Sequence, residues 1–89
     1  MIKLFKTTDE KLRDIGFEKV DESEHGVFYE RLAPQNFVQE VAILHRYNGR
    51  HIIRSYDQDT DTVCGLTYHE ARLFLRKMRE LGWHKEEQE

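Results

Sequence analysis

Residues 37–57 read FVQEVAILHRYNGRHIIRSYD, and this stretch decides the fold. Two runs rich in Val, Ile, Leu and Tyr flank the dipeptide Asn48-Gly49. Asn-Gly is the strongest short-range signal for a β-hairpin, because both central residues of a type I′ turn take a positive φ that Asn and Gly tolerate best. The stretch therefore predicts two antiparallel strands in the middle of a small sheet.

The predicted hairpin register argues against a metal site built from histidines. A two-residue turn at Asn48-Gly49 places His45 opposite Ile52, so His45 and His51 project from opposite faces of the sheet. A single cysteine cannot build a structural zinc site either. We therefore predict no metal ligands among these side chains.

Two further runs extend the sheet toward the N-terminus, and a helix lies at each end. Residues 17–22 and 27–33 each predict a strand. Threonine–glutamate capping boxes begin helices near residues 7 and 67, and a glycine ends each of them, at positions 16 and 82. The predicted order is therefore helix, four strands, helix.

Short connections between the strands favour an antiparallel meander. We expect an α+β fold with an antiparallel sheet of about four strands, a short N-terminal helix and a C-terminal amphipathic helix. The 89 residues leave room for one domain, which we place at residues 1–83, followed by a charged C-terminal tail at residues 84–89.

The strands carry apolar residues toward both faces of the sheet, at residues 27–29 and again at 41–44. Either the two helices cover one face each, or a second copy of the chain covers what is left. The spacing i, i+3, i+4, i+7 predicts that the last helix buries Ala71, Phe74, Leu75 and Met78. Leu73 then falls on the outer side of the helix, and we take it as a candidate for self-association.

Arginines form the main candidate binding surface. Residues 41–56 contain no acidic residue, and the last helix carries arginines at i, i+4 and i+7. The candidate nucleic-acid-binding residues are Arg46, Arg50, Arg54, Arg72, Arg76 and Arg79. Guanidinium groups match phosphate geometry. The alternative is a solvated helix flank and charged hairpin tips, which the net charge of −3 favours.

An acidic segment follows the hairpin, with Asp57, Asp59 and Asp61 at alternate positions. Alternating carboxylates open an EF-hand loop, but Thr62 stands where that loop needs glycine and Tyr68 stands where it needs glutamate. We interpret the segment as a solvated turn, with a weak calcium site of another kind as the alternative.

No motif points to catalysis. Cys64 precedes a helix N-terminus and His69 lies in its first turn, but the flanking Val63 and Leu66 favour a buried small side chain at Cys64. The chain has no glycine-rich phosphate loop. We therefore predict no enzymatic activity and no cofactor.

Composition bears on location. One cysteine excludes an internal disulfide and suits a reducing compartment. The N-terminal residues contain no apolar run of signal-peptide length, and no stretch approaches the ~20 apolar residues of a membrane span. We expect a cytoplasmic protein without membrane contact.

Several local patterns lie between residues 11 and 83. They include KLRDIGFEKV, a strand with Tyr29-Glu30, the strand HIIRSYD and the helix GLTYHEARLFLRKMRELGW. In these features the chain resembles small phage and prophage proteins of Gram-positive bacteria. The resemblance implies a cytoplasmic accessory protein of about this size and assigns no catalytic or binding residue.

These observations favour a non-enzymatic protein-interaction module. It would bind a protein partner, or itself as a homodimer, through a sheet face or an edge strand together with the last helix. The alternative function is a nucleic-acid-binding accessory protein that uses the arginines of the hairpin and the last helix.

Overall fold

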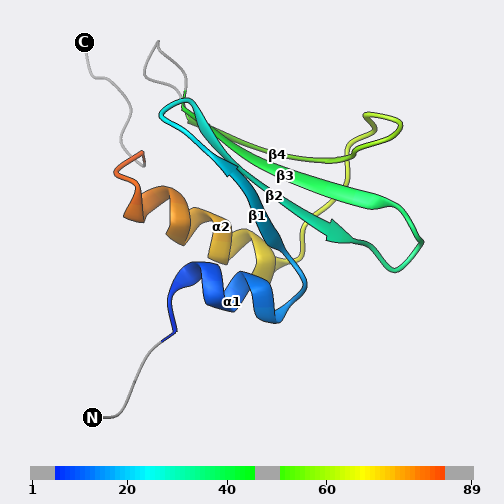
Figure 1. Cartoon of the computed structure of the whole chain (residues 1–89), viewed down its shortest axis with the longest axis horizontal. Coiled ribbons are helices and arrows are strands. Elements are labelled where there is room, and N and C mark those ends of the chain that lie inside the picture. Colours follow the sequence, from blue (N-terminus) through cyan, green and yellow to red (C-terminus); the bar gives the residue numbers. More distant parts are fainter. Residues whose placement is uncertain (1–5, 46–50, 84–89) are drawn as a thin grey trace.

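A computed structural model describes residues 6–45 and 51–83, which form two layers (Figure 1). The elements are α1 (Thr8–Asp14), β1 (Glu18–Glu22), β2 (Gly26–Leu32), β3 (Val38–His45), β4 (His51–Asp57) and α2 (Tyr68–Glu80). The strands form one antiparallel sheet in the order β1-β2-β3-β4. The predicted α+β fold, with a four-stranded meander and a helix at each end, is confirmed.

Local capping contacts set the ends of both helices. At the start of α2 the Thr67 side chain accepts a hydrogen bond from the Glu70 amide at 3.1 Å, and the Glu70 carboxylate accepts one from the Thr67 amide at 3.0 Å. At its end Gly82 takes a left-handed φ of 79°, and the Trp83 amide donates to the Met78 carbonyl at 2.9 Å. The same capping box and left-handed glycine bound α1.

The hydrophobic core lies between the helices and one face of the sheet. Its fully buried members include Leu12, Phe17, Val27, Tyr29, Val41, Ile43 and Phe74. The Phe74 ring meets the rings of Phe17 and Tyr29 edge-on, with centroids 5.1 and 5.4 Å away. Because side chains alternate along a strand, the inward residues of β2 and β3 all meet the helices on this one face.

Leu73 belongs to this core, so the prediction that it lies on the outer side of α2 is wrong. Its side chain is only 6% exposed, whereas Leu75, which we expected to be buried, is 50% exposed. The physical reason is that α2 packs against α1 as well as against the sheet. The buried stripe therefore widens toward α1, where Leu73 lies, and Leu75 turns to solvent.

The register of the central hairpin is shifted by one residue from the predicted one. His45 pairs with His51, and Ile43 pairs with Ile53. The expected register would have set Ile43 opposite Arg54; the observed one keeps Ile43 and Ile53 together on the core face, which favours it. Asn48-Gly49 itself lies outside the described residues.

Both helices cover the same face of the sheet, and no described helix covers the other (Figure 1). We call this second face the open face. Its side chains come from Phe28, Glu30, Leu32, Val38, Glu40, Ala42, Leu44, Ile52, Arg54 and Tyr56. Of the two arrangements that the sequence allowed for the apolar residues on both faces, one helix per face is therefore wrong.

The first strand is built as an edge. All five residues of β1 are exposed, and four of them are charged. Its pairing with β2 shifts between Lys19 and Asp21, as a β-bulge does. Charge and a bulge on an edge strand discourage pairing with another sheet.

Leu73 is buried and Leu75 is half exposed on the same helix, so the two leucines make a matched pair of variants. Leu73→Ala should lower the free energy of unfolding by about 2–5 kcal/mol, because it opens a cavity in the core. Leu75→Ala should change it by less than about 0.5 kcal/mol, because the side chain is half exposed. Urea denaturation followed by circular dichroism measures both. Equal losses of unfolding free energy in the two variants would contradict the greater burial of Leu73.

Candidate functional site

The arginines predicted on the last helix all lie on the outer side of α2, and α1 adds a lysine beside them. The three guanidinium side chains are exposed. Together with α1 they border a groove of about 440 Å³, which we call the basic groove. Its lining residues are Lys11, His69, Arg72, Leu73, Leu75, Arg76 and Arg79.

Polar contacts between the helices bring Lys11 to the groove. Thr8, in the first turn of α1, donates a hydrogen bond to Glu80 at the end of α2. Next to it, Lys77 lies 3.3 Å from the Asp9 carboxylate. The helices therefore pack with the start of α1 against the end of α2, and Lys11 faces the middle of α2. Sequence analysis missed Lys11 because no local pattern shows how helices about sixty residues apart will dock.

The basic groove holds more cations than local ion pairs neutralise. Arg76 lies 3.4 Å from Glu80, a contact exposed on both sides. Lys11 and Arg79 form no ion pair with any described residue, and no described carboxylate lines the groove. The Arg72 guanidinium lies 5.7 Å from the centre of the Tyr68 ring, which is 79% exposed. The groove is therefore locally positive on a chain of net charge −3.

Arg54 does not belong to this surface. It projects from the open face, where its guanidinium lies 4.7 Å from the Tyr56 ring centre and 3.6 Å from Asp61. The basic groove is lined by residues of α1 and α2, and both helices lie on the other side of the sheet (Figure 1). Arg46 and Arg50 lie outside the described residues. The predicted six-arginine surface is thus divided, with Arg54 separated from the helix arginines.

The open face is the second candidate surface, with an apolar region at one end and an acidic row beside it. Three cross-strand rows run over β2, β3 and β4: Gly26, Leu44 and Ile52; then Phe28, Ala42 and Arg54; then Glu30, Glu40 and Tyr56. Ala42 is 2% exposed, and Phe28, Leu44 and Ile52 are part-exposed. The apolar residues of the first two rows therefore form one continuous patch.

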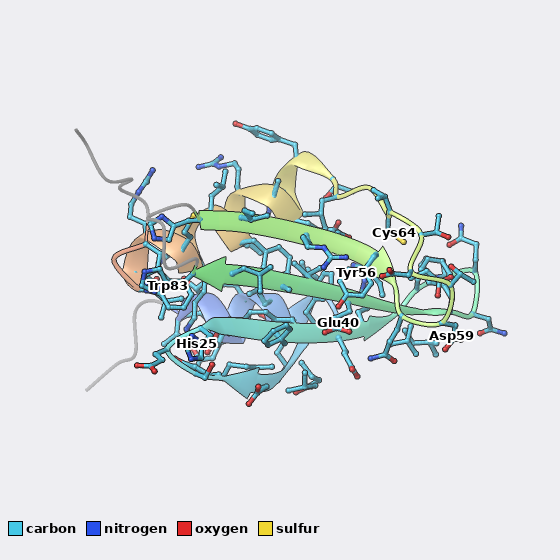
Figure 2. The ribbon with its side chains drawn as sticks, turned by 90° about the horizontal axis from the view of Figure 1, so that it is seen from above. His25, Glu40, Tyr56, Asp59, Cys64 and Trp83 are labelled. Atoms are coloured by element: carbon cyan, nitrogen blue, oxygen red, sulfur yellow. The ribbon has the colours of Figure 1, made fainter. Side chains whose placement is uncertain are left out.

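In the acidic row, hydrogen bonds order the carboxylates. Figure 2 shows Glu40 and Tyr56 beside each other on this face. The Gln58 amide donates to Glu30 at 2.6 Å and to Glu40 at 3.3 Å. Burial, and then the hydrogen bond to Glu40, raise the pKa of Tyr56. The Tyr56 hydroxyl therefore stays protonated and acts as a donor.

His45 and His51 lie on the same face of the sheet, so the prediction that they project oppositely is wrong. Their rings stack with centroids 4.9 Å apart, and the Trp83 ring packs 4.6 Å from His45. The register shift of the hairpin is the cause. No three His, Cys, Asp or Glu side chains within residues 6–45 and 51–83 come together as a metal-binding group. The three rings close the end of the core beyond α2.

The acidic loop after β4 uses its first carboxylate internally. Asp57 accepts hydrogen bonds from the amides of Asp59 at 2.9 Å and Thr60 at 3.4 Å. Such bonds build a turn, as the sequence suggested. The loop's last aspartate, Asp61, has a left-handed φ of 60°.

Cys64 is part-exposed, so the expectation of a buried thiol is wrong. The segment runs along the free edge of β4 and not over the core: Val63 forms a bridge with Tyr56, and the Cys64 amide donates to the Ser55 carbonyl at 2.9 Å. Val63 is accordingly 85% exposed. A cavity of about 340 Å³ lies between this segment and β4.

A polar network that no sequence pattern indicated lies at the edge of the core. The Arg31 guanidinium contacts the Glu70 carboxylate at 2.8 Å, donates to Gln39 at 2.7 Å and stacks 4.2 Å from the Phe17 ring centre. Gln39 in turn donates to Ser55 at 2.9 Å. The network joins β2, β3, β4 and α2.

The lowered pKa of Glu70 indicates that this network has a structural role. Burial by itself would raise the pKa of Glu70, but hydrogen bonds from the Thr67 backbone and from Arg31 outweigh it, so the pKa lies below its ordinary value of 4.5. The carboxylate is held ionised and caps α2. It is poorly suited to accept a proton from a substrate.

Comparison of the chain with protein-family models, curated proteins and solved structures finds no match. No described helix is long and apolar enough to cross a membrane. The likeness to phage proteins and the cytoplasmic location stay predictions. The function must therefore be inferred from the basic groove and the open face.

Glu70→Gln tests the buried network. The variant should lose roughly 1.5–3 kcal/mol of stability at neutral pH, because a charge-assisted hydrogen bond to Arg31 is removed. The lowered pKa of Glu70 means that its contribution is present above pH 4.5 and is lost as pH falls through the folded-state pKa. The difference in unfolding free energy between wild type and variant should therefore become smaller in acid.

Denaturant unfolding across this pH range measures the effect. Glu24→Gln is the matched control, since the Glu24 side chain is 85% exposed, and it should behave as wild type. A stability gap for Glu70→Gln that stays constant into acid would contradict the lowered pKa.

Proposed function

We propose that this chain is a non-enzymatic interaction module that binds a protein partner through its open face, and that this partner is a second copy of the same chain. The observation that carries the proposal is the continuous apolar patch of Phe28, Ala42, Leu44 and Ile52 on a sheet face that no described helix covers.

An exposed sheet face normally alternates with the core face and is polar. Here the open side of three adjacent strands carries apolar side chains at Phe28, Leu44 and Ile52. Scattered exposed apolar residues are ordinary, but a contiguous patch rimmed by charge is typical of an interaction surface. Arg54 and the carboxylates of Glu30 and Glu40 supply that rim.

The pattern on the open face is self-complementary. Two sheets pack about 10 Å apart with their strands nearly aligned. A two-fold axis parallel to β3 places β3 over β3 and β2 over β4 of the other copy. Ile52 then lies over Gly26 of the second copy, where the Phe28 and Leu44 side chains already cover the glycine, so apolar side chains meet apolar side chains. Ala42 lies near the axis, where its small size lets the sheets approach.

The charged groups fit the same arrangement with one exception. Arg54 comes to lie over the Phe28 ring of the second copy, and Tyr56 lies over its Glu30. The first is a cation–π contact, whereas the Tyr56 hydroxyl already donates its single hydrogen to Glu40 of its own chain and adds no further hydrogen bond. Glu40 meets Glu40 across the axis, and like charges there weaken the pair. Removal of the Glu40 charge should therefore strengthen the proposed dimer.

Two variants with equal change in charge test the proposal. Leu44→Glu puts two further carboxylates on the axis and should convert a dimer into a monomer of 10.8 kDa. Leu75→Glu carries the same change on the outer side of α2 and should leave the mass unchanged. Sedimentation equilibrium measures the masses, and circular dichroism checks that both variants are folded.

Glu40→Gln is the third arm and should tighten the dimer, because it removes the like-charge contact at the axis. This gain cannot come from a loss of folding. A wild-type chain that is monomeric at every concentration, or a dimer that Leu44→Glu leaves intact, would overturn the proposal.

A further inference from the structure

We infer that the basic groove between α1 and α2 binds the phosphate backbone of a single-stranded nucleic acid, with Lys11 as part of the site and Arg54 outside it. This site lies on the helix layer, away from the open face, and the inference does not depend on how the open face is used.

Cations border the groove from both helices. On α2, Arg72, Arg76 and Arg79 follow one another at i, i+4 and i+7. At 1.5 Å per residue they span about 10 Å along the helix, enough to follow a strand past more than one phosphate. Lys11 contributes a fourth positive charge from α1. Guanidinium forks bind phosphate oxygens in pairs, and a lysine adds a point charge.

The placement of these charges exceeds what helix stability explains. Basic residues in the last turn stabilise a helix through its dipole, which accounts for Arg79. The dipole also favours Lys11, in the last turn of α1, but Arg72 and Arg76 lie outside the last turn of α2 and gain nothing from it. A solvated flank would also balance its charges, yet no described carboxylate lines the groove.

Aromatic and apolar side chains beside the groove favour a nucleic acid over an acidic peptide. Tyr68 precedes Arg72 by one helical turn, is 79% exposed and lies 5.7 Å below its guanidinium. Leu75, on the same side of α2, is 50% exposed. An exposed ring beside cations is what bases stack on in single-strand-binding proteins. A peptide of aspartates and glutamates would use the cations and leave the ring unused.

A single strand fits better than a duplex for the same reason. Bases in a duplex are stacked on each other and are not free to stack on Tyr68. A single strand can place its phosphates along the arginines while one base turns onto the ring.

Fluorescence anisotropy with a short labelled oligonucleotide tests the site. The wild-type chain should bind single-stranded DNA or RNA more tightly than a duplex of the same sequence, and its affinity should fall with salt. Each phosphate contact contributes about −0.7 to the slope of log affinity against log salt. Lys11→Ala and Arg72→Ala should each flatten the slope by about that amount. Tyr68→Ala should weaken binding about tenfold and leave the slope unchanged, since stacking is not ionic.

Arg54→Ala is the matched control, because it removes the same charge from the other side of the molecule. It should bind as wild type does. The two leucine variants give opposite results in the two assays: Leu75→Glu, at the groove, should weaken oligonucleotide binding, and Leu44→Glu, on the open face, should retain it.

Three results would overturn the inference. The first is no salt-dependent binding of wild type to any single strand. The second is an equal loss of affinity in Arg54→Ala and Arg72→Ala, which would indicate non-specific attraction. The third is equal binding of a glutamate-rich peptide with no effect of Tyr68→Ala, which would assign the groove to acidic proteins.

Discussion

The contact of Phe74 with the rings of Phe17 and Tyr29 is the constraint on which the rest of the structure depends. It holds α2 on the same face of the sheet as α1, so both helices share one layer (Figure 1). Two surfaces follow from this one choice. The helices lie side by side and leave the basic groove between them, and the opposite side of the sheet receives no helix and becomes the open face.

Buried and half-buried polar contacts then fix how the helices sit. Asp9 accepts a hydrogen bond from the Tyr29 hydroxyl at 2.7 Å and lies 3.3 Å from both Lys19 and Lys77. Burial and then this hydrogen bond raise the pKa of Tyr29. The Arg31 and Glu70 pair holds the other end of α2. A directional contact therefore anchors each end of α2, and these contacts set where the arginines on its outer side lie relative to Lys11.

The elements were predictable from sequence because local chemistry specifies them. Each helix begins at a capping threonine and ends at a glycine, Gly16 or Gly82, and these local contacts do not depend on the rest of the chain. The errors concern contacts between distant segments. Leu73 is buried by α1 as well as by the sheet. The hairpin register follows the match of Ile43 with Ile53 and not the turn alone. Lys11 enters the groove only through helix docking, so three of its four cations were found and the fourth was not.

The two edges of the sheet limit what any assembly of this chain can become. The segment with Val63 and Cys64 lies along β4, and β1 presents charges and a bulge. Neither edge therefore offers a clean row of amides and carbonyls to a further strand. The proposed dimer uses one face of each chain and would therefore close at a pair. The described parts of the two edges disfavour the stepwise strand addition that leads to fibres.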